Sequence, residues 1–389
     1  MKASETLNTP ERLALYRRVA YLAGAGMKQS DIAARLSVNQ STVSKRLNEA
    51  EDLGFVCLLP TLPAKELEEI RHQFSATAAL ELAVRSILPK VAHVCVCPRP
   101  FHRFAALHLD LVLEEALSES GHLSSACVAW GETAQQTLAA LEPYARHTKL
   151  KAWDRVKCVA ARGDFLMADV PPEQSATTNA LILSRILNGP HAGVRGGDPA
   201  VIPLTGIPAV VPRGVGLNTK QAETTVRDYY REVLRICFDA WDDLDLIVLS
   251  VGGAVPSNAA PQSFLGERQF RQPLAATVTQ YLAGDLAGIW LTKADEQVPD
   301  DVRASMEDNQ SLWLGLEKAH VSACAAKARK WRDAEGSVGP PGVVVLAGGT
   351  EETALSVLTG KAICIRAAAR EGLITRVICD EAVAQAIVG

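Results

Sequence analysis

The sequence predicts two domains: a small all-α unit, then a large α/β domain with a mostly parallel sheet and helices on both faces. In the first sixty residues, apolar side chains recur at helical spacing. From about residue 90 to the end, strand-like apolar runs alternate with helix-like stretches, which is typical of a parallel sheet covered by helices. Between these regions stand Pro60 and Pro63, which resist helix continuation and indicate an extended connector.

The N-terminal unit is predicted to contain three helices. The first spans Pro10–Ala25, with its proline in the first turn, where the missing N–H costs nothing. A short helix follows at Met27–Leu36. After a tight turn at Ser37–Asn39, a third helix spans Gln40–Asp52, with Asn39 as its N-cap.

The apolar spacing of the second and third helices indicates how they pack. Ile32 and Leu36 lie four residues apart on one helix face, and Val43 and Leu47 lie four apart on the next, with Val38 at the corner between them. Such a pair is typical of a helix-turn-helix, in which the start of the second helix enters a DNA major groove.

The exposed start of the third helix carries groups suited to DNA. Its short polar side chains can bond base edges or phosphates, and basic residues follow one turn later. Between residues 28 and 46, four basic residues stand against one acidic residue. The predicted DNA-contacting residues are Lys28, Gln29, Asn39, Gln40, Ser41, Thr42, Ser44, Lys45 and Arg46.

A three-helix bundle for protein contacts is the alternative interpretation of this unit. However, the string QSDIAARLSVNQSTVSKRL closely resembles the helix-turn-helix of many bacterial regulators, with Ser37 where that pattern usually has glycine. We therefore predict a winged-helix-like helix-turn-helix domain at residues 1–57, a linker at 58–66, and an α/β effector-binding and oligomerisation domain at 67–389.

The overall composition is that of an ordinary globular protein. Apolar residues make up 48% and charged residues 22% of the 389 positions, which excludes wholesale disorder. A net charge of -4 argues against a protein that binds nucleic acid along its whole surface. The same net charge is compatible with one small basic DNA-binding module. Because the N-terminus is polar, we expect no secretory leader, and no apolar run approaches the ~20 residues of a membrane span. Because nine scattered cysteines suit a reducing compartment, we expect a cytoplasmic protein.

The elements of the large domain follow from apolar runs and helical spacing. Predicted strands are Ala92–Cys97, Ser124–Trp130, Val156–Ala161, Leu244–Val251, Gly342–Ala347, Ala362–Ala367 and Arg376–Cys379. Predicted helices are Lys65–Phe74, Ala78–Leu88, Ala105–Leu117, Ala134–Leu141, Thr224–Trp241 and Thr353–Leu358.

Four predicted strand ends carry glycine or polar residues, at 130–133, 161–164, 250–253 and 347–352. Parallel sheets bind ligands beyond the carboxyl ends of their strands. At Gly131–Thr133, backbone N–H groups and the dipole of the following helix could hold a phosphate or a sugar hydroxyl. The convergence of these ends at one sheet edge predicts a binding site.

The order of segments resembles the SorC family of sugar-responsive transcription regulators, whose effector domain is similar to the sugar-phosphate isomerase and deaminase fold. After the N-terminal helices, the resemblance is carried by these segments, in this order: LGFVCLLP, WGETAQQTLAAL, LTGIPAVVP, LDLIVLSVGGA, YLAGDLAG, VVVLAGGTEETALSVLTG and VICDEAVAQAIV.

This resemblance implies a repressor or activator that binds operator DNA as a homodimer or homotetramer and responds to a small carbohydrate, without a cofactor. The implied effector-binding residues are Gly131, Glu132, Thr133, Arg162, Gly253, Asp285, Gly349, Thr350 and Glu352. After its paired glycines the family commonly carries a lysine, whereas this chain has Glu351 and Glu352. Since carboxylates repel phosphate, we expect a neutral sugar or polyol, although Lys361 could compensate for a phosphorylated one.

The main alternative is an enzyme on the same fold, a sugar-phosphate isomerase or deaminase, which needs a placed acid and base. His102 and His108 lie six apart in a helical stretch, on different faces. Asp242, Asp243 and Asp245 are interpreted as a solvated loop at a strand entry. The sequence has no metal-ligand spacing and no nucleophile motif, so we expect neither enzymatic activity nor a metal site. A structural adaptor is the third interpretation, and the DNA-reading string argues against it.

Overall fold

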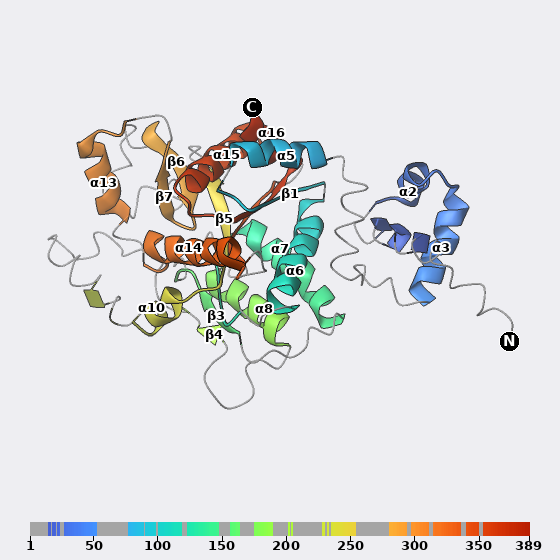
Figure 1. The fold of residues 1–389 in the computed structure, drawn as a ribbon, viewed down its shortest axis with the longest axis horizontal. Helices are drawn as coiled ribbons and strands as arrows, with labels where there is room; N and C mark the ends of the chain where they lie inside the picture. Colours follow the sequence, from blue (N-terminus) through green and yellow to red (C-terminus); the bar gives the residue numbers. More distant parts are fainter. Residues whose placement is uncertain are drawn as a thin grey trace.

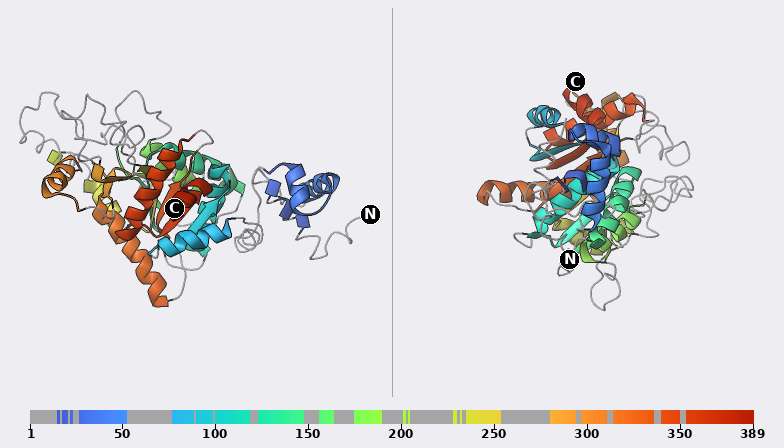
Figure 2. Two further views of the ribbon diagram at one scale, coloured as in Figure 1. Left: turned by 90° about the horizontal axis from the view of Figure 1, so that it is seen from above. Right: turned by 90° about the vertical axis from the view of Figure 1, so that its right-hand side faces the viewer.

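The protein is described here from a computed structural model. The described residues are 15–16, 18–20, 22–23, 27–52, 77–88, 90–98, 100–118, 123–147, 156–163, 175–189, 201–202, 204, 228–229, 232, 235–253, 280–293, 297–310, 314–335, 340–349 and 353–389. The predicted linker, the helix at Lys65–Phe74 and any winged-helix extension beyond residue 52 lie outside them. Figures 1 and 2 show the N-terminal helices at one end of the molecule and the α/β domain at the other.

The N-terminal unit contains the predicted helices. The described residues between 15 and 23 are helical, α2 spans Gln29–Arg35 and α3 spans Gln40–Asp52. Their buried side chains are the ones at helical spacing, including Val19, Ile32 and Val43. Burial of this apolar stripe stabilises the unit, because short isolated helices are marginal in water.

The described strands of the large domain form one sheet. Seven strands run parallel in the order β1-β9-β8-β5-β2-β3-β4. They are β1 (His93–Cys97), β2 (Ser125–Val128), β3 (Lys157–Ala160), β4 (Val201–Ile202), β5 (Leu246–Gly253), β8 (Gly342–Ala347) and β9 (Arg376–Asp380). Every residue of β8 is buried, as a central strand covered on both faces requires. The predicted mostly parallel sheet is confirmed.

An antiparallel hairpin extends the end of β5 beyond the parallel sheet. It consists of β6 (Leu282–Leu286) and β7 (Ile289–Thr292). Gly252 lies opposite Asp285, and Gly253 lies opposite Gly284. Gly284 has a φ of 148°, and a Cβ there would clash with the Gly252 carbonyl, so this close pairing depends on glycine.

Helices cover both faces of the sheet. On one face lie α6 (Phe101–Ser118), α7 (Glu132–His147) and α8 (Ala176–Asn188), packed side by side. On the other lie α10 (Arg235–Asp242), α14 (Lys318–Glu335) and α15 (Leu355–Arg370). This division follows from right-handed crossovers, because the chain moves across the sheet in one direction through α6–α8 and in the other afterwards. The remaining described helices are α5 (Ala78–Ile87), α13 (Asp300–Gln310) and α16 (Glu381–Val388).

Two sequence-based predictions are wrong. The predicted strand Ala362–Ala367 lies inside the single long helix α15. Its short apolar run was ambiguous by length, but its buried residues recur at helical spacing. Asp245 belongs to no solvated loop, since only 3% of it is exposed. No element had been predicted at α8, α13, α14, α16 or the β6–β7 hairpin.

Asp245 aligns the amino ends of the central strands. Its Oδ2 accepts hydrogen bonds from Ser124 N (2.7 Å), Ser124 Oγ (2.8 Å) and Ser125 N (3.2 Å), and its Oδ1 pairs with Lys327 Nζ at 2.7 Å. Its backbone carbonyl accepts from Gly342 N at 2.9 Å. Asp245, the residue directly before β5, therefore joins the starts of β2 and β8.

Replacement of Asp245 should destabilise the α/β domain. We expect Asp245→Ala to lower the free energy of unfolding by about 3–5 kcal/mol, because the buried Ser125 N–H and the neighbouring Ser124 N–H lose their acceptor and Lys327 loses its buried partner. Asp243 is the matched control: it also pairs with Lys327, at 2.6 Å, but its side chain is 79% exposed. Asp243→Ala should cost less than about 1 kcal/mol. Urea denaturation measures both, and equal losses would contradict the structural role of Asp245.

Candidate functional site

The turn between α2 and α3 contains Ser37, at the position where similar helix-turn-helix sequences usually have glycine. Its backbone conformation explains that preference. Ser37 has a φ of 54°, in the left-handed region that side-chain-bearing residues rarely adopt. The turn is closed by a hydrogen bond from Val38 N to the Ala33 carbonyl (3.0 Å), and Val38 packs against the core. The backbone therefore redirects sharply within three residues and leaves the start of α3 exposed.

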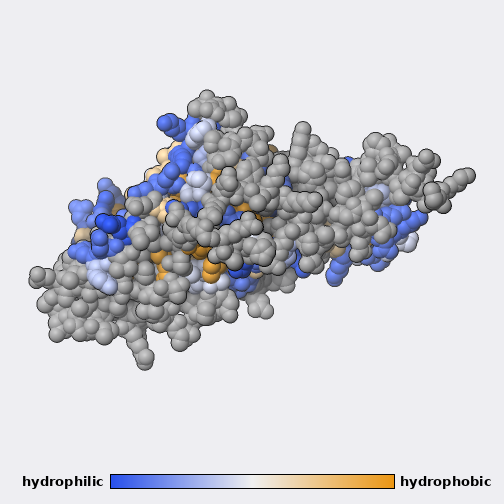
Figure 3. Space-filling model, turned by 90° about the horizontal axis from the view of Figure 1, so that it is seen from below, coloured by the Kyte–Doolittle hydropathy of each residue, from blue (hydrophilic) through white to orange (hydrophobic). Residues whose placement is uncertain are grey.

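Asn39 caps α3, as predicted. Its Oδ1 accepts hydrogen bonds from Thr42 N (2.7 Å), Ser41 Oγ (2.7 Å) and Thr42 Oγ1 (2.6 Å). Three of the predicted DNA-contacting side chains thus contact one another at the helix start. Lys28, Gln40 and Lys45 are exposed, and Gln29 and Ser44 are partly exposed. On the face shown in Figure 3, the described part of this unit is mostly hydrophilic.

Arg46 is held within the N-terminal unit. Its Nη1 donates to Glu49 Oε2 (2.5 Å) and to Tyr16 OH (3.1 Å), and its guanidinium lies 5.3 Å from the centre of the Tyr16 ring. Only 16% of its side chain is exposed. The hydrogen bond to Glu49 raises the pKa of Arg46. We therefore assign Arg46 to the packing of α3 on the first helix, although the sequence predicted DNA contact.

The predicted turns of the large domain come together at the carboxyl edge of the sheet. Because β8, β5, β2 and β3 are neighbours in that order, the residues that follow them share one edge. Gly131 has a φ of 117°, and a Cβ there would meet the Ser250 hydroxyl, which donates to the Trp130 carbonyl (2.9 Å). We call this edge, with the turns that begin at Gly131 and Gly348, the sheet-edge site.

Glu132 and Thr133 begin α7 at this edge. Glu132 is exposed, and its Oε1 accepts from Gln136 Nε2 at 2.7 Å. Thr133 is partly exposed, and its carbonyl accepts from the Thr137 hydroxyl (2.8 Å), so the Thr133 carbonyl is used within the helix. The helix dipole adds positive potential at this end of α7.

The glycine turn after β8 is held from three directions. Gly348 lies against the Phe101 ring with no space for a Cβ, and Gly349 N donates to Asp380 Oδ2 at 2.9 Å. Lys361, in the second turn of α15, donates a hydrogen bond from its ammonium to the Gly348 carbonyl. Burial lowers the pKa of Lys361 despite the opposing charges of Asp380 and Glu132. Lys361 therefore places a cation beside the glycine turn. The sequence alone indicated only that this lysine could compensate for the negative charge of a phosphorylated ligand.

His102 is a site residue that the sequence analysis set aside. It follows β1 at the start of α6, and burial lowers its pKa, with Glu132 opposing this shift and Lys361 adding to it. Burial therefore favours the neutral imidazole. Its Nδ1 is buried and has no hydrogen-bond partner among the described residues. The signal that could have found His102 was its place directly after a strand end, rather than its spacing from His108.

Arg162 and Asp285 lie at the junction between β3 and the hairpin. The Arg162 guanidinium donates to three main-chain carbonyls, those of Ala287, Leu314 (3.4 Å) and Leu316 (3.1 Å). Burial lowers the pKa of Arg162 to about 10. Asp285 Oδ1 accepts from Gly288 N at 2.8 Å, within the hairpin turn. Both residues thus support the hairpin, and their predicted ligand contacts remain predictions.

Other predicted site residues are only partly described. Gly253 ends β5 opposite Gly284. Thr350 and Glu352, with Glu351, lie outside the described residues. Among the residues that the structure describes, no group of three His, Cys, Asp or Glu side chains could hold a metal ion. Likewise, every described helix is too short or too polar to cross a bilayer.

Comparison with solved structures gives extended matches. The full-length sorbitol operon regulator SorC from Klebsiella pneumoniae matches 97% of this chain and 100% of its own, at 14% identity and a TM-score of 0.52. The chain has the fold of SorC. A probable sor operon regulator from Shigella flexneri (13% identity, TM-score 0.52) and a DeoR family transcriptional regulator from Listeria monocytogenes (12%, 0.50) each match 80% of this chain, and 99% and 100% of their own. No family model matches the sequence, and no curated protein matches it significantly.

The left-handed turn gives a stability prediction. Ser37→Gly should stabilise the α2–α3 pair by about 1 kcal/mol, because glycine adopts a positive φ without the penalty of a Cβ. Hydrogen-exchange protection of the α2 and α3 amides measures this gain. Ser30→Gly, inside α2, is the matched control and should reduce protection, since glycine weakens a helix interior. Reduced protection in Ser37→Gly would contradict the assigned turn.

Proposed function

We propose that this protein is a transcription regulator that binds operator DNA through α2 and α3 and changes its operator affinity when a small carbohydrate binds the sheet-edge site. The match with SorC carries the proposal, because it covers the whole of a full-length regulator rather than its α/β domain alone. All three neighbours reported above are named as regulators, which argues against the alternative of an isomerase or deaminase.

The exposed start of α3 supports the DNA-binding part. Gln40 and Lys45 are exposed on this helix, and Lys28 is exposed just before α2. Ser41 and Thr42 remain close to the helix N-terminus, where backbone N–H groups favour a phosphate. One such module makes few contacts, so we infer a homodimer or homotetramer that reads a palindromic operator.

The sheet-edge site supports the effector-binding part. Glu132 and Thr133 offer an acceptor and a hydroxyl, and the backbone turn at Gly349 follows β8 at the same sheet edge. His102 and Lys361 are close enough for the charge of Glu132 to act on their pKa values. Such alternation of donors and acceptors suits sugar hydroxyls. Because Glu351 and Glu352 add negative charge in the sequence after Gly349, we infer a neutral sugar or polyol rather than a phosphate.

The DNA surface can be tested with a duplex selected from a random library by the unmodified protein. The double variant Gln40→Ala/Lys45→Ala should bind it at least about tenfold more weakly, with a salt dependence reduced by about one unit per DNA-contacting subunit. Fluorescence anisotropy at several salt concentrations gives both values. Arg85→Ala, which removes an exposed arginine from α5, is the control. Unchanged affinity and salt dependence in the double variant would contradict the α3 assignment.

The effector site can be tested by thermal stability against sugars, polyols and their phosphates. A ligand at 100 times its Kd should stabilise the protein by about 2.7 kcal/mol. Thr133→Ala should reduce this shift and leave DNA binding without ligand unchanged. Thr359→Ala, on the exposed side of α15, is the matched control. A full shift in Thr133→Ala would remove Thr133 from the site, and a response to phosphates alone would overturn the neutral-ligand inference.

A further inference from the structure

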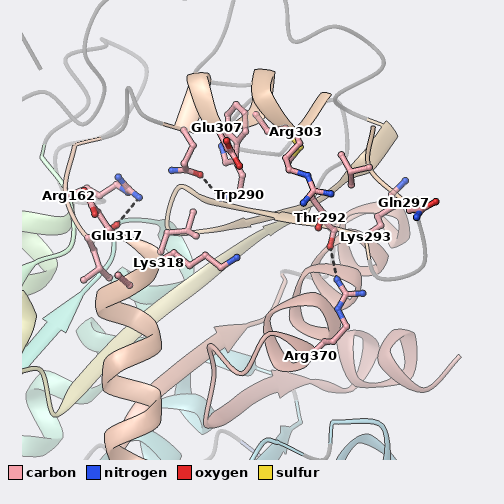
Figure 4. Close-up of a pocket in the computed structure, with 16 residues that line it drawn as sticks. Arg162, Trp290, Thr292, Lys293, Gln297, Arg303, Glu307, Glu317, Lys318 and Arg370 are labelled. Atoms are coloured by element: carbon pink, nitrogen blue, oxygen red, sulfur yellow. Dashed lines mark hydrogen bonds between the residues drawn. The ribbon is translucent and has the colours of Figure 1, made fainter. Parts of the chain in front are cut away.

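A cavity of about 700 Å³ lies between β7, α13, the start of α14 and the end of α15 (Figure 4). This volume is in the range of small-molecule sites in proteins, about 300–1,000 Å³. Of the residues predicted from the sequence to bind an effector, Arg162 alone lines it. Gly131, Thr133 and Gly349 contribute nothing to its walls, so it is separate from the sheet-edge site.

The lining of this cavity carries an excess of positive charge. Lys293, Arg303, Lys318 and Arg370 come from four different segments and stand against the two carboxylates of Glu307 and Glu317. Arg162 is left out of this comparison because its guanidinium is bound to main-chain carbonyls. Cations that converge on a concave surface attract and hold anions more strongly than the same charges spread over an open surface.

The basic side chains keep donors available for a ligand. Arg303 forms no side-chain hydrogen bond or ion pair with another described residue. Lys293 Nζ donates to the Gln280 carbonyl (2.5 Å), Arg370 Nη2 donates to the Thr292 carbonyl (3.4 Å), and Lys318 pairs with Glu371. Since lysine has three donors and arginine five, each retains others. Figure 4 shows Arg303 and Arg370 approaching β7 from opposite sides, with Lys318 to one side of both.

An apolar wall stands beside these charges. Trp290 is only 7% exposed, and its indole N–H has no hydrogen-bond partner among the described residues. Gln310 fixes this wall, because its Oε1 accepts from Trp290 N (2.7 Å) and its Nε2 donates to the Gly288 carbonyl (2.9 Å). The end of α13 thereby covers the open edge of β7. Ile289, Met306 and Leu316 complete the apolar part.

From this combination we propose that the cavity is an accessory binding site for an organic anion, a phosphate monoester or carboxylate that carries a small apolar or aromatic group. The anionic group binds Arg303, Lys318 and Arg370, and the apolar group packs on Trp290 and Met306. Phosphate monoesters and carboxylates share the acceptor geometry that arginine binds.

Isothermal titration of the full-length protein with phenyl phosphate tests this proposal. We expect one phenyl phosphate per chain, with weaker binding of inorganic phosphate and of phenol, because each lacks one half of the ligand. The double variant Arg303→Ala/Lys318→Ala should raise the Kd at least about tenfold; both residues are exposed, so the fold should be retained. Lys330→Ala removes another exposed lysine of α14 outside the cavity and should leave the Kd unchanged.

Two further variants separate this site from the sheet-edge site. Trp290→Phe keeps an aromatic wall but removes the indole N–H, and it should weaken phenyl phosphate binding severalfold. Thr133→Ala should leave it unchanged. Three outcomes would overturn the proposal: no binding at millimolar concentrations, equal binding in the Arg303/Lys318 variant, or loss of binding in Thr133→Ala alone. The last would place the anion at the sheet edge, and none of the three would bear on DNA binding.

Discussion

The parallel alignment of four central strands is the constraint on which the rest of this structure depends. In β8, β5, β2 and β3, Leu246 lies opposite both Gly342 and Ala126, and Ala126 lies opposite Cys158, so all four strands run level in one direction. Their carboxyl ends therefore emerge at the same edge, and turns more than a hundred residues apart become neighbours. Asp245 holds the opposite ends level, where its carboxylate binds the start of β2 and its carbonyl the start of β8.

The hairpin of β6 and β7 extends the carboxyl end of β5 beyond the parallel sheet. Arg162 follows the end of β3. Its guanidinium donates hydrogen bonds to the Ala287 carbonyl in the hairpin turn and to the Leu316 carbonyl in the segment before α14. One buried guanidinium thus joins three segments that the sheet itself does not connect. Arg162 also lines the basic cavity, to which Gly131 and Gly349 of the sheet-edge site contribute nothing.

In the N-terminal unit, intramolecular bonds decide which polar residues remain available. Asn39 uses its side chain to cap α3, and Arg46 uses its guanidinium on Tyr16 and Glu49. Gln40 and Lys45 stay exposed between these two anchors. The helix pair therefore presents a small polar surface whose orientation is set by buried contacts.

The sequence by itself determined the N-terminal helices, the Asn39 cap, most of the strands and the glycine-bearing strand ends, because each of these depends on local spacing and turn chemistry. It failed at Ala362–Ala367, where a short apolar run fits a strand and a buried helix equally well. Only the tertiary structure decided that Arg46 packs on Tyr16, that Arg162 binds the hairpin, that the charge of Glu132 acts on His102 and Lys361, and that four basic residues share one cavity. Those side chains find partners across long stretches of chain, so their roles depend on strand order and hairpin placement, which no local pattern encodes.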